Sequence, residues 1–190
     1  MTFALVLIAA YLLGSIPTSF LVVYWLRRQD IRTLGTGNPG TMNVLETIGR
    51  RAAFVVGLGD IGKGMAAVGL AYAAGLSDTH AILAAFVAVA GHDWSIFLRL
   101  RGGNGTGPAV GAMFALLPLP AFVGLAIATV TLLILRSRRI AGIAGLLATP
   151  ALAYLLQAPD ARILGTIALL GFTYLKIGRS EGFSPARPGR

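Results

Sequence analysis

Residues 3–26 read FALVLIAAYLLGSIPTSFLVVYWL, a stretch without a single charged side chain. A helix of about 20 apolar residues is long enough to cross the roughly 30 Å hydrocarbon core of a bilayer. The stretch has no basic segment before it and no evident small-residue cleavage site, and it ends at Arg27-Arg28. We therefore interpret it as a retained membrane span rather than a signal peptide.

The composition of the whole chain agrees with a membrane protein. Its 190 residues are 56% hydrophobic and 12% charged, against about 45–50% and about 25% in an ordinary soluble domain. The mean hydropathy is +0.78. This composition excludes a soluble globular protein. The sequence has no cysteine, which excludes disulfides, thiolate metal sites and a cysteine nucleophile, and we find no metal-ligand spacing, so no metal and no cofactor is expected.

Six further apolar segments follow, at residues 53–75, 80–98, 106–117, 119–135, 140–157 and 162–177. The segment at 106–117 is short, and Pro118 and Pro120 bracket the turn after it. Seven spans of alternating direction place fourteen of the sixteen Lys and Arg residues on one side, which the positive-inside rule assigns to the cytoplasm. We therefore predict an all-α, polytopic transmembrane bundle of about seven spans, with one domain at 1–180 and a basic cytoplasmic tail at 181–190.

The positive charge of the chain is explained by this topology. A net charge of +9 would suggest a nucleic-acid partner in a soluble protein. Here the cations belong to the cytoplasmic loops, and we expect no nucleic-acid partner. The N-terminus is predicted outside the cell, whereas the C-terminus and any water-exposed chemistry are predicted at the cytoplasmic face.

The first cytoplasmic loop contains LGTGNPGT at residues 34–41. Glycine permits positive φ and close backbone approach, so successive N–H groups can converge on an anion. A short helix predicted at 42–49 would aim its N-terminus at the same point. The alternative is a plain interfacial turn. The candidate phosphate-binding residues of this loop are Gly35, Thr36, Gly37, Asn38, Gly40 and Thr41.

A second glycine cluster, RGGNGTG at residues 101–107, follows His92-Asp93 at the cytoplasmic end of the third span. Two such loops on one face would suit a substrate that carries or exchanges phosphate. The alternative is that the glycines only break a helix. His92 is either an acid or base, or a structural hydrogen-bonding residue. The candidate anion contacts are Gly102, Gly103, Asn104 and Gly105.

Asp60 and Lys63 lie three residues apart inside the second span, about two turns from its cytoplasmic end. Each charge alone would cost roughly 3 kcal/mol in mid-membrane, so we expect the two to face the interior and pair. Lys63 can instead reach a phosphate while Asp60 holds it. Within the first span, GSIPTS at 14–19 predicts either a kink at Pro17 or a place where another helix, or an acyl chain, approaches closely.

Together these motifs resemble the PlsY family of bacterial membrane acyltransferases. The matching pieces, in order, are GSIP at 14–17, DIR at 30–32, GTGNPG at 35–40 with Asn43, Asp60 with Lys63-Gly64, Gly91-His92 and GGNG at 102–105. The resemblance implies transfer of an acyl group from acyl phosphate to glycerol 3-phosphate at the bacterial plasma (inner) membrane, by a monomer in contact with membrane lipids. It implies no protein nucleophile, because the phosphate of acyl phosphate takes the proton. It assigns the catalytic roles to Asn43, Asp60, Lys63 and His92.

The chain departs from the family pattern at specific positions. Glu46 stands near a position where the family has arginine, and Asn104 replaces the lysine of a G-G-K-G loop. Ala141 replaces a serine, and Thr173 and Lys176 replace the histidine and asparagine of H-x-x-N. Lys176, or Arg50 with Arg51, would restore the missing charge from another position. Two rival hypotheses are a family member that binds phosphorylated lipid or acyl phosphate with altered or lost catalysis, and a small transporter.

Overall fold

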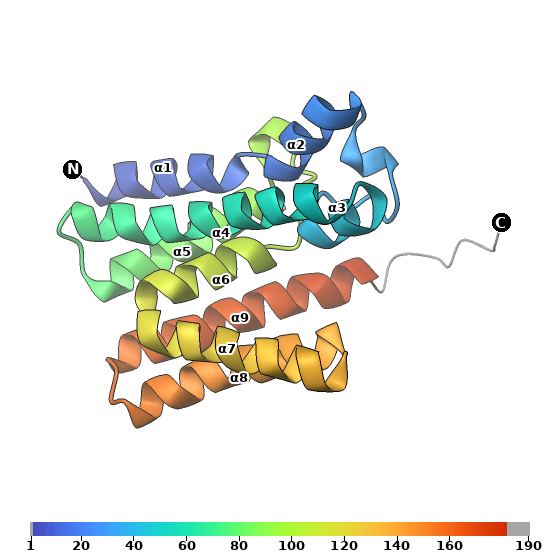
Figure 1. Cartoon of the computed structure of the whole chain (residues 1–190). Coiled ribbons are helices and arrows are strands. Elements are labelled where there is room, and N and C mark those ends of the chain that lie inside the picture. Colours follow the sequence, from blue (N-terminus) through green and yellow to red (C-terminus); the bar gives the residue numbers. More distant parts are fainter. Residues whose placement is uncertain (1, 182–190) are drawn as a thin grey trace.

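The computed structural model describes residues 2–181, which form helices joined by turns and loops without any strand (Figure 1). The elements are α1 (Phe3–Ser15), α2 (Thr18–Arg27), the 3-10 helix η1 (Ile31–Thr33), α3 (Thr41–Thr47), α4 (Arg50–Ala73), α5 (Asp78–Asp93), the 3-10 helix η2 (Ile96–Leu98), α6 (Thr106–Leu116), α7 (Pro118–Leu135), α8 (Arg138–Leu155) and α9 (Asp160–Glu181). The long helices run back and forth side by side (Figure 1). The all-α prediction is confirmed.

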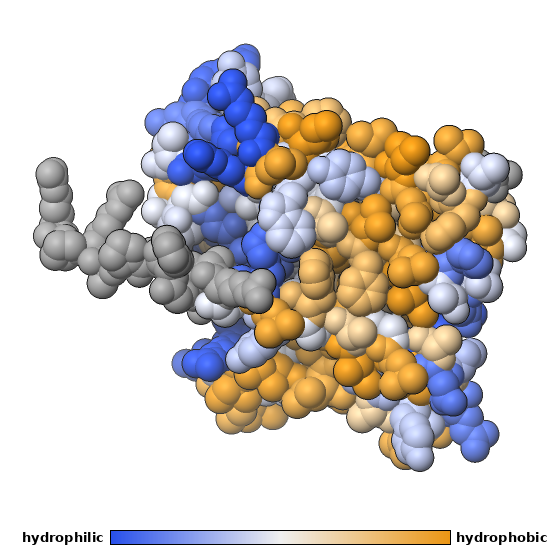
Figure 2. All heavy atoms as spheres, turned by 180° about the vertical axis from the view of Figure 1, so that it is seen from behind, coloured by the Kyte–Doolittle hydropathy of each residue, from blue (hydrophilic) through white to orange (hydrophobic). Residues whose placement is uncertain are grey.

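Five helical segments are long and apolar enough to cross a membrane. They are Phe3–Arg27, Arg50–Ala73, Asp78–Leu98, Pro118–Leu135 and Asp160–Gly178. Figure 2 shows apolar side chains covering the broad face of the molecule, with polar groups at its two ends. The chain is therefore a multi-pass membrane protein. The predicted count of seven adds α6 and α8. With 11 residues, α6 is about 16 Å long, and α8 carries Arg138 and Arg139 at its start, so this count stays a prediction.

The first span is broken in its middle, as the GSIPTS motif predicts. Helix α1 ends at Ser15 and α2 begins at Thr18. Pro17 has no N–H to donate to the preceding turn, and its ring disfavours a helical conformation at Ile16. Ile16 accordingly has extended backbone, with φ −55° and ψ 117°. This break turns the carbonyl of Ile16 toward the interior, where the candidate site uses it.

Helix α6 is short because both of its ends are fixed by local sequence. It begins after Gly105, which has a left-handed φ of +68°, and it stops at Leu117, the residue before Pro118. Pro118 and Pro120 fall in the first turn of α7, where proline is well tolerated. The predicted turn at these prolines is confirmed.

The bundle around the site packs through backbone rather than through large side chains. A Cβ on Gly64 would strike the backbone of Pro108, and a Cβ on Gly111 would strike the backbone of Ile61. These two contacts bring α4 and α6 into direct apposition, the kind of packing that small residues permit between membrane helices. Buried alanines of α5 continue this pattern toward α1 and α4. The end of α6 is thereby fixed beside α4.

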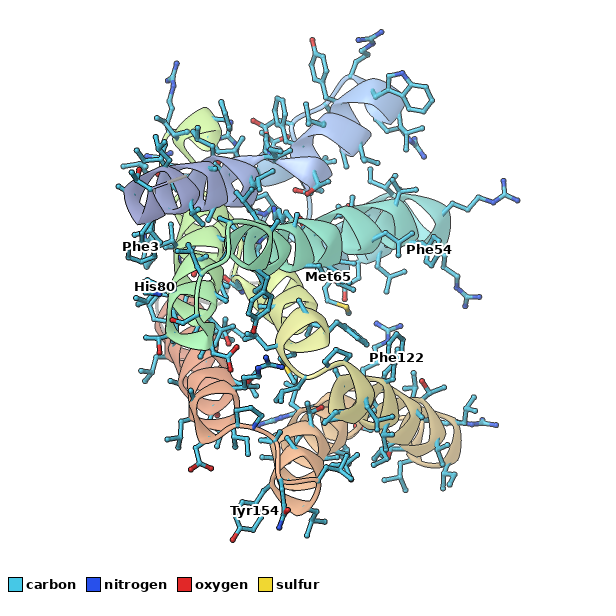
Figure 3. All side chains as sticks on the ribbon, turned by 90° about the vertical axis from the view of Figure 1, so that its left-hand side faces the viewer. Phe3, Phe54, Met65, His80, Phe122 and Tyr154 are labelled. Atoms are coloured by element: carbon cyan, nitrogen blue, oxygen red, sulfur yellow. The ribbon has the colours of Figure 1, made fainter. Side chains whose placement is uncertain are left out.

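Large side chains point outward from the helices. Figure 3 shows Phe54 on α4, Phe122 on α7 and Tyr154 on α8 projecting away from the helices that carry them, and these residues are 67%, 62% and 72% exposed. Exposed aromatic and aliphatic side chains of this kind suit a lipid environment. Charged and glycine-rich loops gather instead beside α2 and α3, and this polar end of the bundle carries the candidate site.

Candidate active site

Both glycine-rich loops face one cavity of about 1900 Å³. Its walls come from the segment between α2 and α3, the segment between α5 and α6, and side chains of α4, α6 and α9. The predicted site residues that line it are Thr36, Gly37, Asn38, Gly40, Thr41, Asn43, Asp60, His92, Gly102, Gly103, Asn104 and Gly105. Gly35 and Lys63 lie outside this lining. The structure thus brings together two segments about sixty residues apart in the chain.

Asn43 organises the first glycine-rich loop. Its side-chain oxygen accepts a hydrogen bond from the N–H of Thr36 at 3.1 Å. Its side-chain nitrogen donates to the carbonyls of Leu34 and Asn38, both at 3.0 Å, and of Ile31 at 3.3 Å. The residue is only 3% exposed. The structure therefore gives Asn43 the role of holding the loop, because its amide is occupied by loop backbone.

The N–H groups of this loop are also paired among themselves. Gly37 donates to Leu34, Gly40 donates to Asn38, and the N–H of Asn38 donates to the hydroxyl of Thr36 at 3.4 Å. Gly35 has a left-handed φ of +52° and passes close to the side chain of Asn43. Glycine is needed at position 35 for this turn, and the residue does not line the cavity. Within the predicted nest, the N–H groups of Thr36, Gly37, Asn38 and Gly40 are thus already paired.

The second glycine-rich loop folds back on the end of α5. Gly102 donates to the carbonyl of Asp93 and Gly103 donates to the carbonyl of His92, both at 3.1 Å. A Cβ on Gly102 would strike the carbonyl of His92, and a Cβ on Gly103 would strike the imidazole of His92. Glycine is therefore required here for close backbone approach. The loop therefore ends a helix, as one alternative predicts, and it also lines the cavity, whereas its anion contacts stay a prediction.

Two helix N-termini open onto the cavity. Gly40 precedes α3 and Gly105 precedes α6, and neither gives its helix a side-chain cap. The first N–H groups of a helix have no partner within it, and the helix dipole adds partial positive charge there. Thr41 and Thr106, the first residues of the two helices, both line the cavity. This arrangement supplies N–H donors and a positive field for an anion.

Asp60 and Lys63 form the predicted buried pair at the base of the cavity. The Lys63 ammonium lies 2.9 Å from Asp60 Oδ1 and donates to the carbonyl of Ile16 at 3.0 Å. The hydroxyl of Thr18 also donates to Asp60 Oδ1. His92 Nδ1 lies 3.7 Å from the same oxygen. The structure thus favours the pairing role for Lys63, since its ammonium is bonded by Asp60 and Ile16 and the residue does not line the main cavity.

The GSIPTS segment is bonded to the first glycine-rich loop and to the end of α5. The hydroxyl of Ser15 donates to Gly91 at 3.2 Å, and that of Ser19 donates to Pro39 at 2.8 Å. Ser95, just after α5, donates to the carbonyl of Ser15 at 2.5 Å. The predicted kink and a close helix approach therefore occur together, because α1 lies against α5 at the break and the Ser19 hydroxyl anchors the first glycine-rich loop.

Sequence reasoning overlooked a bridge between η1 and η2. The Arg32 guanidinium bonds the Asp30 carboxylate, with a shortest distance of 2.6 Å, and donates to the carbonyl of Leu98 at 3.2 Å. Arg32 lowers the pKa of Asp30 below its usual value of 3.8, chiefly through these side-chain hydrogen bonds. The DIR motif at 30–32 is the sequence signal for this pair.

Some of the positions that depart from the family pattern line the cavity, and others lie elsewhere in the bundle. Glu46, Asn104 and Lys176 line the cavity. Ala141 and Thr173 are buried elsewhere, and the hydroxyl of Thr173 donates to carbonyls of its own helix. Among the cations expected to compensate, Lys176 reaches the cavity, whereas Arg50 and Arg51 are absent from its lining.

These observations define a class of protein: a multi-pass membrane protein whose polar end carries a cavity suited to a phosphate-bearing ligand. The chain belongs to the glycerol-3-phosphate acyltransferase (PlsY) family, whose model matches residues 4–179. Among curated relatives, the glycerol-3-phosphate acyltransferase of Dechloromonas aromatica is 37% identical over 94% of this chain and 92% of its own. That of Clostridioides difficile is 37% identical over 78% and 76%.

Coverage is lower for other relatives. Glycerol-3-phosphate acyltransferase 5 of Dehalococcoides mccartyi is 38% identical, but the alignment covers 66% of this chain and 54% of that protein. The chain thus spans about half the length of this relative. Among solved structures, PlsY (YgiH), an integral membrane glycerol 3-phosphate acyltransferase, matches in its glycerol 3-phosphate form with a TM-score of 0.82 and 24% identity, over 100% of this chain and 96% of that one. Its lysophosphatidic acid form matches with 0.81 and 23%. This likeness establishes the fold.

Proposed function

We propose that this protein transfers an acyl group from acyl phosphate to glycerol 3-phosphate, which yields lysophosphatidate and inorganic phosphate. The observation that carries the proposal is the convergence of two glycine-rich loops and two uncapped helix N-termini on one cavity. Family membership and the names of the relatives support the same activity. The product is a precursor of phospholipids, and a membrane-embedded enzyme is well placed to release it into the bilayer.

The reaction requires no protein nucleophile. A hydroxyl oxygen of glycerol 3-phosphate attacks the acyl carbon, and the bond between that carbon and the phosphate oxygen breaks. The hydroxyl proton passes to the departing phosphate, so the products are an ester and hydrogen phosphate. The protein's contribution is to bring two anionic substrates together and to stabilise negative charge on the leaving phosphate.

The residues of the site form two groups: those proposed to contact phosphate and those that hold the phosphate-binding loops. Thr36, Asn38 and the Gly102–Gly105 loop line the cavity and are proposed to contact phosphate oxygens. Asn43 holds the first loop, and His92 lies between Asp60 and the second loop. Asp60 and Lys63 fix α4 against the broken first span. These four residues, proposed as catalytic, act in this account by holding the phosphate-binding loops in place.

We further propose a setting for this activity. The chain forms a single domain over 1–180 and works as a monomer surrounded by lipid in the bacterial inner membrane. Its N-terminus lies outside and its site faces the cytoplasm, because that orientation puts fourteen cations on the cytoplasmic side. Of the proposed tail at 181–190, Glu181 ends α9 and residues 182–190 lie outside the described residues.

A second candidate function is binding of acyl phosphate or phosphorylated lipid with altered or lost turnover. The specific observation in its favour is that Glu46 and Asn104, which stand in for family cations, both line the cavity. Each lost charge-assisted hydrogen bond is worth about 1.5–3 kcal/mol. The second candidate predicts saturable substrate binding without product.

A matched pair of glycine variants tests the leading proposal. In the Gly103→Ala variant the new methyl group displaces the His92 imidazole, whereas in Gly62→Ala it meets open space. Purified protein in detergent would receive acyl phosphate and glycerol 3-phosphate, with lysophosphatidate measured by mass spectrometry. We expect product from wild type and Gly62→Ala, and at least a tenfold slower rate from Gly103→Ala. Binding without product in wild type would favour the second candidate, and equal rates in both variants would contradict the placement of the site.

A further inference from the structure

A buried carboxylate beneath the second glycine-rich loop is left without hydrogen bonds. Asp93 is 1% exposed, and neither of its carboxylate oxygens has a hydrogen-bond partner among residues 2–181. The carboxylate lies directly under Gly105, where a Cβ would come within 2.9 Å of Oδ1. A buried carboxylate is unfavourable unless a positive charge is near. Asp93 therefore needs a cation.

That cation comes from the other end of the chain. The ammonium of Lys176, on α9, lies 3.9 Å from Asp93 Oδ2 and 4.2 Å from the centre of the Trp94 ring. The Trp94 ring in turn packs on Phe172 of α9, with ring centres 6.2 Å apart. A charge over an aromatic face is attracted to it. The end of α5 thus positions the Lys176 ammonium by one charge and one ring.

The ammonium nevertheless keeps its hydrogen-bonding capacity. A distance of 3.9 Å is too long for a hydrogen bond to Asp93, and no acceptor bonds the Lys176 ammonium within the part of the chain that the structure describes. Its side chain is 22% exposed and lines the cavity with both glycine-rich loops. Lys176 thus offers three N–H donors at the wall of a cavity suited to phosphate.

The other cations near the cavity are differently placed. Arg32 is bonded by Asp30 and by the carbonyl of Leu98. Lys63 is bonded by Asp60 and by the carbonyl of Ile16. Arg99 and Arg101 are exposed side chains at the rim. Among described residues, Lys176 is the cation that combines a mostly buried position in the cavity wall with unused donors.

We propose that Lys176 binds the phosphate group of a substrate, that Trp94 is a positioning residue that holds its ammonium beside the cavity, and that Asp93 is the counter-charge that phosphate replaces. The inference rests on the proposed function in that the phosphate belongs to glycerol 3-phosphate or acyl phosphate. Lys176 then supplies, from α9, the charge that Asn104 and Glu46 do not supply.

This arrangement predicts opposite effects on phosphate affinity for substitutions of Asp93 and of Lys176. Asp93 competes with phosphate for the ammonium, so removal of its charge in Asp93→Asn frees Lys176 for the ligand. Removal of the ammonium in Lys176→Met leaves phosphate without its cation and next to an unpaired carboxylate. A purely structural ion pair would instead respond to both substitutions in the same way, through lower stability.

The test measures binding directly, in detergent and without turnover. Isothermal titration with glycerol 3-phosphate, and separately with inorganic phosphate, gives Kd for wild type, Lys176→Met, Lys176→Arg and Asp93→Asn. The matched control is Arg139→Met, which removes an exposed cation of α8 that does not line the cavity. We expect Kd to rise about 10- to 150-fold in Lys176→Met, as for loss of a charge-assisted hydrogen bond. Lys176→Arg should recover most of the affinity, Asp93→Asn should lower Kd, and Arg139→Met should leave it unchanged.

Trp94→Leu keeps the buried charge of Asp93, so it tests the positioning of Lys176 even if Asp93→Asn does not fold. Trp94→Leu should raise Kd in the presence of Lys176 and should have no further effect in the Lys176→Met background. Equal Kd values for Lys176→Met and Arg139→Met would overturn the inference, as would additive effects of Trp94→Leu and Lys176→Met. A separate turnover assay on wild type keeps the two claims apart. If Lys176→Met loses phosphate affinity and the wild type yields no product, the proposed function is refuted. The role of Lys176 in phosphate binding then stands.

Discussion

Asp60 lies where three segments meet, since its carboxylate accepts from Thr18 after the helix break and from Lys63 on its own helix, and faces His92 at the end of α5. Both charges of the pair are less than 10% exposed. Both side chains are therefore largely shielded from solvent. At the scale of single residues, the site is therefore held by mutual satisfaction of buried polar groups rather than by apolar packing.

Removal of one member of this pair should cost more than removal of both. Asp60→Asn or Lys63→Met alone leaves an uncompensated buried charge, which costs about 3–5 kcal/mol, whereas the double variant leaves none. Thermal unfolding of the four proteins in one detergent forms a double-mutant cycle. A coupling energy near zero would mean that the two charges do not interact.

Restored cations at the departing positions should strengthen phosphate binding. Asn104 and Glu46 line the cavity, so Asn104→Lys and Glu46→Arg each add a charge-assisted contact worth about 1–3 kcal/mol, or roughly 5- to 150-fold in Kd. The gain should be largest at low salt, where the added charge is least screened. Weaker binding of glycerol 3-phosphate in both variants would show that the loops suit a different ligand.

The Asp30–Arg32 pair should stabilise the first loop only above acidic pH. Arg32 lowers the pKa of Asp30 in the folded state below 3.8, so the stabilisation is present above the unfolded pKa and is lost as pH falls through the folded pKa. The pair is about 30% exposed, so its contribution is about 0.2–1 kcal/mol. Asp30→Asn should melt earlier than wild type at pH 6, and the difference should vanish in acid. A constant difference would exclude an ionic origin.

At the scale of secondary-structure elements, helix ends and helix contacts determine the shape of the cavity. Helices α3 and α6 present their N-termini to it, and α6 can do so because its glycines let it lie against α4. Gly64 and Gly111 make backbone contacts across this interface, whereas Gly69 of the same α4 faces open space. The α4–α6 contact is therefore sensitive to a single methyl group.

Glycine substitutions on these helices should separate packing from helix propensity. Gly111→Ala forces α6 away from Ile61 and should lower the free energy of unfolding by about 1–3 kcal/mol. Gly69→Ala changes only propensity and should raise it by up to about 1 kcal/mol. Thermal unfolding under identical detergent conditions compares the two. Equal melting temperatures would contradict the close contact.

Elements were predictable from the sequence where local chemistry determines them. Pro17 and Pro118 mark the break in the first span and the end of α6, and both are confirmed. The boundaries shifted by a few residues, since the span predicted at 53–75 forms α4 at Arg50–Ala73. The function of the first loop was harder to predict. Glycine spacing at 35–40 predicts possible N–H donors, but not that the side chain of Asn43 and neighbouring carbonyls already pair with them.

At the scale of the whole molecule, the packing of the helices determines which distant segments of the chain come into contact. The two glycine-rich loops were expected on one face from the topology, and they do share a cavity. That α9 contributes Lys176 to the same wall could be stated only as one alternative, because the sequence contains no local signal for a contact between residues 93 and 176. Long-range contacts of this kind depend on helix packing angles, which a single sequence does not specify.

The orientation of the molecule is open to a direct prediction. A cysteine placed at Asp78, the first residue of α5, should react with a membrane-impermeant maleimide added outside the cell. One placed at Asn104 should react only after the membrane is opened. The native chain has no cysteine, so background labelling is absent. Labelling of Asn104→Cys from outside would reverse the topology and the cytoplasmic position of the site.

The central claim, that this cavity joins acyl phosphate to glycerol 3-phosphate, is tested most directly by stoichiometry. Purified wild-type protein in liposomes would receive labelled glycerol 3-phosphate and acyl phosphate, with lysophosphatidate and free phosphate counted in the same samples. We predict equal amounts of both products, and no lysophosphatidate when either substrate is left out. Phosphate release without lysophosphatidate, or no release at all from protein that binds both substrates, would contradict the account.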